Sequence, residues 1–145
     1  MYSNLIIAVD MAHPEQIPHL VKAAVNLSSD ITTPHYHVVY VDETHIHQAM
    51  YPQIDEAQDK EARKELKRKL KAEIATALPE GADFECHVRA GTAHEQILEE
   101  SRQIKADVIV MMARRPGLAS YFVGSNAERV VRHAKCTVLV LRGNY

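Results

Sequence analysis

The run Leu5-Ile6-Ile7-Ala8-Val9-Asp10 sets the fold class of this chain. Consecutive apolar residues over this length are typical of a short strand that is buried on both faces. Such strands occur in parallel sheets that are covered by helices, and the polar Asp10 marks the end of the strand. We therefore expect an α/β protein that is built on a parallel sheet.

Two kinds of apolar pattern alternate along the rest of the chain. Strict alternation of strands and helices favours right-handed crossovers, which make the strands parallel and put helices on both faces of the sheet. We therefore predict one domain, residues 1–145, with a doubly wound five-stranded sheet in the order 3-2-1-4-5. The later strands are predicted at residues 37–41, 84–89, 108–112 and 137–141, and the helices at residues 17–30, 55–78, 92–104 and 125–133.

Two S/T-x-x-E patterns predict where helices begin. They are Thr92-Ala93-His94-Glu95 and Ser125-Asn126-Ala127-Glu128. In a capping box the hydroxyl and the glutamate each bind a backbone N–H group of the first turn. The patterns therefore place one helix start just after Gly91 and another at Ser125.

Composition and charge narrow the functional class. The chain has 145 residues, of which 46% are apolar and 25% are charged, and this is ordinary globular composition. A net charge of -2 and a pI near 6.5 leave no basic excess for a phosphate backbone, so we expect no nucleic-acid partner. The amino-terminal apolar run is too short for a signal peptide or a membrane span, and we expect a cytoplasmic protein. Cys86 and Cys136 lie in separate apolar segments, which favours reduced core thiols.

The predicted strand order points to one edge of the sheet as the ligand site. In doubly wound sheets, ligands bind beyond the carboxyl ends of the strands, where the strand order reverses. Asp10 follows the first strand, and residues 112–124 follow the fourth. Gly124 and Ser125 then open a helix, whose first N–H groups and dipole suit an anion. We expect Asp10 and this helix start to share one crevice.

The loop before that helix carries two basic residues. The guanidinium groups of Arg114 and Arg115 suit phosphate oxygens. The alternative interpretation is that these arginines are solvated and that Ser125 merely caps its helix together with Glu128. The local pattern leaves both interpretations open.

A longer pattern at both ends of the chain is more specific. It comprises Gly124-Ser125-Asn126-Ala127, the following Val130-Val131-Arg132-His133-Ala134, the closing strand at residues 137–141, and the opening Ile6-Ile7-Ala8-Val9-Asp10. This pattern resembles the universal stress protein family. With Arg115-Pro116 in the loop and Gly-Ser-Asn after it, the chain is similar to a short single-domain subgroup.

The resemblance implies a fold, a ligand and a role. The fold would be adenine nucleotide alpha-hydrolase-like, the ligand ATP, and the role that of a stress-response regulatory protein. ADP or AMP in place of ATP, and an accompanying Mg²⁺, stay open. By analogy Asp10 would lie near the ribose, Val41 and Met111 near adenine, and the start of the last helix near phosphate. The implied nucleotide-binding residues are Ala8, Asp10, Val41, Met111, Met112, Arg114, Arg115, Gly124, Ser125 and Asn126.

The phosphate-binding loop departs from the family pattern. Members that bind ATP carry G-x2-G-x9-G-[ST] after the fourth strand. Gly124 and Ser125 match its end, but Met112 and Arg115 stand at the first two glycine positions, with one residue fewer between them and Gly124. The alternative function is therefore a regulatory dimer whose pocket Met112 closes and which acts through protein contacts. No catalytic residue is predicted, and slow hydrolysis or autophosphorylation stays open.

The last predicted strand, residues 137–141, would lie at an edge of the sheet. An apolar edge strand with unpaired backbone groups favours pairing with another chain. The resemblance implies a homodimer formed through this strand. In the alternative, Arg142 and the polar tail protect the edge.

Histidines occur in two closely spaced pairs. Spacing of two residues on a strand puts His35 and His37 on one face, and the same would hold for His45 and His47. Some metal sites use such pairs, but the sequence places no third ligand. We predict no metal site and expect solvated histidines in loops and at strand ends.

Overall fold

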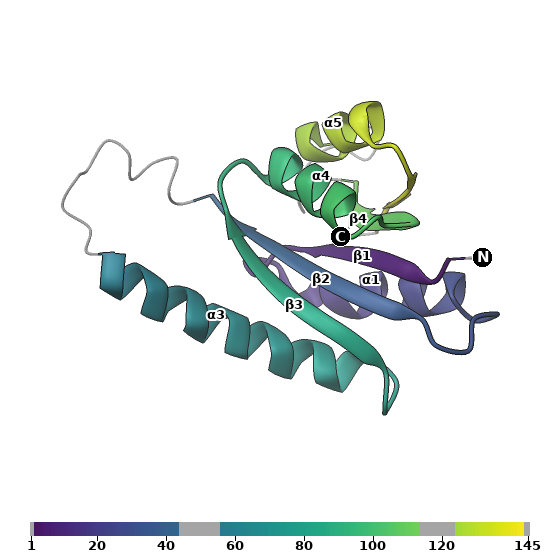
Figure 1. The fold of residues 1–145 in the computed structure, drawn as a ribbon, viewed down its shortest axis with the longest axis horizontal. Coiled ribbons are helices and arrows are strands. Elements are labelled where there is room, and N and C mark those ends of the chain that lie inside the picture. Colours follow the sequence, from purple (N-terminus) through teal and green to yellow (C-terminus); the bar gives the residue numbers. More distant parts are fainter. Residues whose placement is uncertain (1, 44–55, 114–123, 144–145) are drawn as a thin grey trace.

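The fold is known from a computed structural model, which describes residues 2–43, 56–113 and 124–143, with the backbone alone at residues 56–59. The predicted pair His45 and His47 lies outside the described residues. The chain forms a parallel five-stranded sheet in the order β3-β2-β1-β4-β5 (Figure 1). The predicted strand order is confirmed. The elements are β1 (Asn4–Val9), η1 (Pro14–Gln16), α1 (Ile17–Leu27), β2 (His35–Asp42), α3 (Glu56–Ala77), β3 (Asp83–Ala90), α4 (Ala93–Gln103), β4 (Val108–Met112), α5 (Ser125–His133) and β5 (Thr137–Leu141).

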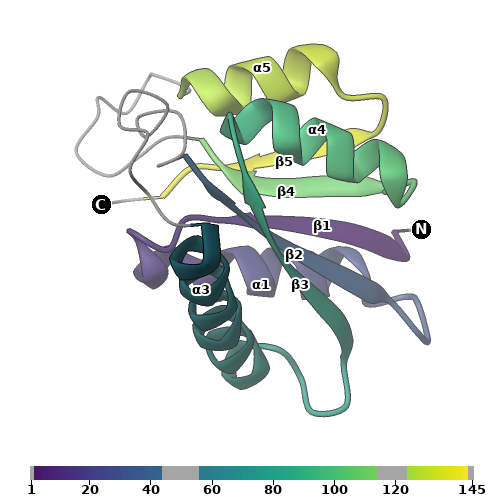
Figure 2. The same ribbon diagram turned by 60° about the vertical axis from the view of Figure 1, so that its left-hand side comes forward.

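The sheet separates two apolar layers. Helices α1 and α3 cover one face, and α4 and α5 cover the other (Figures 1 and 2). Because side chains alternate along a strand, Leu5 and Ile7 of β1 pack toward α1 and α3, whereas Ile6 packs toward α4 and α5. All three side chains are fully buried. This two-sided burial explains why β1 reads as a continuous apolar run.

The two S/T-x-x-E patterns locate the helix starts, but neither forms a side-chain capping bond. At α4, Thr92 occupies the N-cap position without such a bond, and the Ala93 N–H donates to Glu43 Oε1 at 3.1 Å instead. At α5 the N-cap is Gly124, and Ser125 is the first helical residue. Helix α5 thus begins at Ser125 as predicted, but the alternative interpretation of Ser125 as its N-cap is wrong, because Gly124 occupies that position.

The cysteines are free thiols, as predicted. Cys86 is buried between the sheet and α3, and Cys136 is half-buried. Burial raises the pKa of the Cys86 thiol to about 11, and burial also raises the pKa of Cys136. Both groups are therefore held in the unreactive thiol form at neutral pH. Within the part of the chain that the structure describes, no helix has the length and apolarity needed to cross a membrane.

Candidate functional site

A cavity of about 700 Å³ opens at the carboxyl ends of β1, β2 and β4. Small-molecule sites in proteins have volumes of roughly 300–1,000 Å³. The first turns of α4 and α5 complete its wall. Since β1 lies between β2 and β4, the cavity occupies the point where the chain turns from one half of the sheet to the other. Ligand sites of doubly wound proteins occur at this point.

The cavity gathers the residues that the sequence singled out. Asp10 from β1 and the start of α5 line the same hollow, as the predicted strand order requires. Arg114 and Arg115 lie outside the described residues. All the other predicted nucleotide-binding residues line the cavity, namely Ala8, Asp10, Val41, Met111, Met112, Gly124, Ser125 and Asn126.

One wall of the cavity is apolar. It is formed by Val39 and Val41 of β2, Ile97 of α4 and Met111 of β4. Met111 is only 5% exposed and packs with the α4 and α5 layer, whereas the half-buried Met112 packs with the α1 and α3 layer. Both methionines line the cavity, so Met112 forms part of its wall and leaves the space open. The flat face of a nucleobase packs well on such an apolar wall.

A second wall carries carboxylate groups. Asp10 Oδ1 accepts the Ala12 N–H at 2.9 Å, which orients this side chain at the end of β1. Asp42 and Glu43 extend the same wall from the end of β2. Burial raises the pKa of Tyr40, and the neighbouring charges of Asp42, Asp10 and Glu43 raise it further. Carboxylate oxygens accept hydrogen bonds from ligand hydroxyl groups, so this wall suits a sugar.

Sequence reasoning missed Asp42 and Glu43. Both follow β2 directly, just as Asp10 follows β1, and that position at a strand end was the available signal. Glu43 also has a structural role, because its carboxylate accepts a hydrogen bond from the Ala93 N–H, the first N–H group of α4. An acidic group at this position also interacts favourably with the helix dipole.

The start of α5 forms the third wall. Gly124 is extended, with φ of -62° and ψ of 156°, and the next residues begin the helix. Gly124 N–H donates to Ala113 O, and Ala113 N–H donates to Leu141 O at 2.7 Å, so that β4 and β5 anchor the helix start. The N–H groups of the first turn have no acceptor four residues earlier in an α-helix, and Ser125 and Asn126 of this turn line the cavity. The arrangement suits a phosphate.

Residues 1–142 match the model of the universal stress protein family. This chain belongs to that family. Universal stress protein G of Escherichia coli O157:H7 is 26% identical over 142 residues, which are 98% of this chain and 100% of the relative. Universal stress protein G of Salmonella typhimurium is 43% identical over 56 residues, which are 39% of each chain. The family that the sequence resembled is confirmed.

Solved structures agree with this assignment to the universal stress proteins. The hypothetical protein MJ0577 superposes with a TM-score of 0.80 at 20% identity, over 100% of this chain and 99% of the other. A universal stress protein in complex with cAMP gives a TM-score of 0.65 at 16% identity, over 99% and 98% of the two chains. A universal stress protein from Archaeoglobus fulgidus in complex with dAMP gives 0.61 at 19% identity, over 97% and 98%. These likenesses confirm the predicted adenine nucleotide alpha-hydrolase-like fold.

Proposed function

We propose that this universal stress protein binds an adenine nucleotide, with ATP as the first candidate, in the cavity at the strand ends. The observation that carries the proposal is that one cavity combines three kinds of wall: apolar side chains of β2, α4 and β4, carboxylate groups at the ends of β1 and β2, and the start of α5. A nucleotide has three parts that suit these walls, namely a base, a sugar and a phosphate. The complexes of two structural relatives with cAMP and dAMP support an adenine ligand.

The walls suggest how the nucleotide would lie. Adenine would pack on Val41 and Met111, and the ribose hydroxyls would donate hydrogen bonds to Asp10. The phosphates would accept hydrogen bonds from the amides that follow Gly124. Arg114 and Arg115 precede this helix in the sequence and are candidates for further phosphate contacts. A Mg²⁺ ion would be held chiefly by the phosphates.

Titration calorimetry tests the proposal. The purified protein is titrated with ATP, ADP and AMP, with and without Mg²⁺, and with CTP as the control for the base. We expect one adenine nucleotide per chain and weaker binding of CTP, because the smaller pyrimidine covers less of the apolar wall. A ligand that binds the folded protein raises its unfolding temperature. If saturating ATP gives neither a binding heat nor a higher unfolding temperature, ATP does not bind the folded protein and the proposal fails.

We also propose that two copies associate through β5 and that nucleotide occupancy regulates contacts with protein partners. β5 lies at one edge of the sheet, and its residues Val138 to Leu141 are apolar yet only half-buried. A second copy would cover both these side chains and the edge backbone. Sedimentation equilibrium should show a dimer, and Val140→Lys should shift it toward monomer. Thr76→Lys, which changes an exposed threonine of α3 away from β5, is the control and should leave the dimer unchanged. A wild type that remains monomeric at every concentration contradicts this interface.

A further inference from the structure

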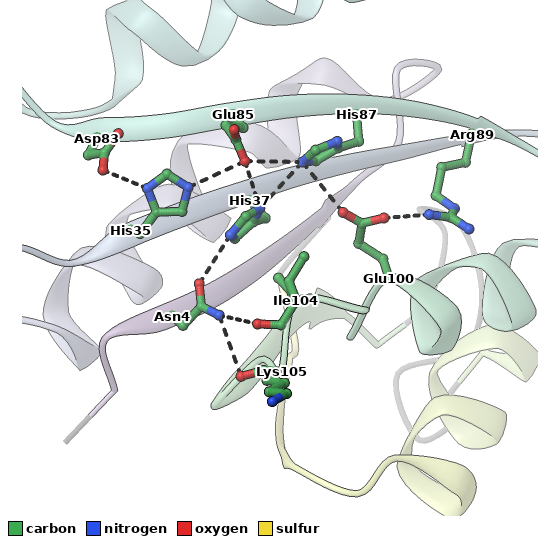
Figure 3. A network of polar contacts seen from close by, with 10 residues as sticks. All are labelled: Asn4, His35, His37, Asp83, Glu85, His87, Arg89, Glu100, Ile104 and Lys105. Carbon is green, nitrogen blue, oxygen red and sulfur yellow. Dashed lines mark hydrogen bonds and ion pairs between the residues drawn. The ribbon is translucent and has the colours of Figure 1, made fainter. Parts of the chain in front are cut away.

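Three histidines and two glutamates converge on the α4 side of the sheet, apart from the cavity (Figure 3). His35 and His37 come from β2, Glu85 and His87 from β3, and Glu100 from α4. The parallel register sets His37 beside Glu85, so these side chains share one face of the two strands. The sequence pattern predicts solvated histidines, and this is wrong for His37, which is only 6% exposed.

One carboxylate oxygen lies among all three imidazole rings. Glu85 Oε2 is 3.4 Å from His35 Nε2, 3.3 Å from His37 Nδ1 and 3.8 Å from His87 Nε2. His37 Nδ1 and His87 Nε2 are themselves 3.3 Å apart. A tetrahedral zinc ion with ligands at about 2.0–2.1 Å holds neighbouring donor atoms about 3.4 Å apart. These four separations between donor atoms, 3.3–3.8 Å, are near the spacing that one such ion requires.

Hydrogen bonds on the far side of His37 orient its ring. Asn4 Nδ2 donates to Ile104 O at 2.6 Å, and this turns the amide oxygen of Asn4 toward His37 Nε2, at 3.1 Å. An amide oxygen only accepts hydrogen bonds, so Nε2 carries the hydrogen. In the neutral ring, Nδ1 then presents its lone pair to Glu85.

His35 is oriented in the same way. Its Nδ1 lies 2.7 Å from Asp83 Oδ2 and donates to that carboxylate, so that in the neutral ring Nε2 presents its lone pair to Glu85 Oε2. Two lone pairs that face a carboxylate oxygen repel it unless a positive charge lies between them. A ring N–H bound to an outer carboxylate or amide oxygen, with the other nitrogen free to coordinate, is the usual arrangement of metal-ligating histidines.

The third ring approaches from the other end of the cluster. His87 Nε2 lies 3.4 Å from Glu100 Oε1, and Arg89 Nη1 binds Glu100 Oε2. Arg89 thereby orients the buried carboxylate of Glu100, whose other oxygen, Oε1, faces the imidazole of His87. His87 Nε2 thus lies within reach of the Glu85 and His37 donor atoms and is the third nitrogen and the fourth donor atom of the cluster.

We propose that His35, His37 and Glu85 bind one divalent transition-metal ion of the zinc class, with His87 completing the coordination. Imidazole with a single carboxylate suits such an ion, whereas Mg²⁺ and Ca²⁺ select sites made of oxygen ligands. Glu85 is 56% exposed, which gives the ion a path from solvent. His37 precedes Val39, the first β2 residue of the cavity wall, by two residues, or about 7 Å, and none of the four proposed metal ligands lines the cavity, so the metal site is distinct from the nucleotide site.

Zinc titration of the untagged, chelator-stripped protein tests this site. We expect one Zn²⁺ per chain by calorimetry, and Co²⁺ should give the visible absorption of a tetrahedral complex. His37→Gln and Glu85→Gln should each weaken Zn²⁺ binding at least about tenfold, and Asp83→Asn should weaken it less, since Asp83 only orients His35. His19→Gln, which changes an exposed histidine of α1, is the matched control and should bind Zn²⁺ like the wild type.

Circular dichroism shows whether each variant folds. If the buried-site variant His37→Gln unfolds, Glu85→Gln still tests the site, because Glu85 is exposed and its substitution should leave the fold intact. The same variants are also titrated with ATP. Their ATP affinity should equal that of the wild type, because the metal site and the nucleotide cavity are distinct. The proposal is overturned if the wild type binds no Zn²⁺, or if folded Glu85→Gln and His19→Gln bind it equally well.

Discussion

Gly124→Asp tests the phosphate-binding role of the α5 start, because it adds a charge there without straining the chain. The backbone of Gly124 has φ of -62° and ψ of 156°, a conformation that any residue adopts. Aspartate and asparagine are both good N-cap residues, so neither should destabilise α5. Gly124→Asn is therefore the matched neutral control.

The size of the effect follows from the position of residue 124. A phosphate bound by the first-turn amides of α5 would lie roughly 5 Å from an aspartate at the N-cap. Two unit charges at that separation repel by about 3 kcal/mol at an effective dielectric constant of 20. This repulsion corresponds to about a hundredfold loss of affinity, reduced somewhat by salt.

The assay is titration calorimetry with ATP, ADP and adenosine. Gly124→Asp should lose most affinity for ATP and little for adenosine, which has no phosphate, while Gly124→Asn should bind all ligands nearly as the wild type does. Unfolding temperatures without ligand should not fall in either variant. If Gly124→Asp binds ATP as tightly as Gly124→Asn, the phosphate does not lie at the start of α5.

Two further predictions concern stability. Glu100→Gln should lower the free energy of unfolding by about 2 kcal/mol, because it leaves Arg89 without its buried carboxylate partner. Urea unfolding with a chelator present measures this loss. A loss below about 0.5 kcal/mol would contradict the ion pair. Burial opposes ionisation of Asp107, but hydrogen bonds from the Ser3 and Asn4 N–H groups, at 2.9 and 2.8 Å, outweigh it and lower the pKa of this carboxyl group. Because the folded-state pKa is depressed, its stabilisation is present above the ordinary value of 3.8 and lost as pH falls through the folded pKa. Asp107→Asn should therefore cost about 1–2 kcal/mol at neutral pH, and the difference from wild type should shrink in acid; a difference that grows in acid refutes this.

The sequence predicted the order and type of the elements well because each carries a strong local pattern. β4 and β5 have the predicted bounds, since apolar runs with clear polar flanks mark buried strands. Right-handed crossovers imply a parallel, doubly wound sheet, and the order 3-2-1-4-5 is one of the orders that such sheets adopt. The positions of Asp10 and Gly124 at one cavity followed from that order, so the outline of the candidate site was also predictable.

The parts that escaped prediction depend on contacts between distant segments. His37 and His87 are fifty residues apart, and they meet only because of the register between β2 and β3, which no local pattern sets. The same holds for Glu43, whose carboxylate binds the start of α4 in place of the Thr92 hydroxyl. Such partners are found from coordinates and not from spacing.

Methionine methyl groups report most directly on the central claim that an adenine nucleotide occupies the cavity at the strand ends. Met111 and Met112 both line it, and their ¹³C-methyl resonances can be assigned with the single variants Met111→Leu and Met112→Leu, which nearly conserve side-chain volume. Titration with ATP should shift the Met111 resonance strongly, through the ring current of the base, and the shift should saturate at one nucleotide per chain. Unchanged Met111 and Met112 resonances at saturating ATP would contradict nucleotide binding in this cavity.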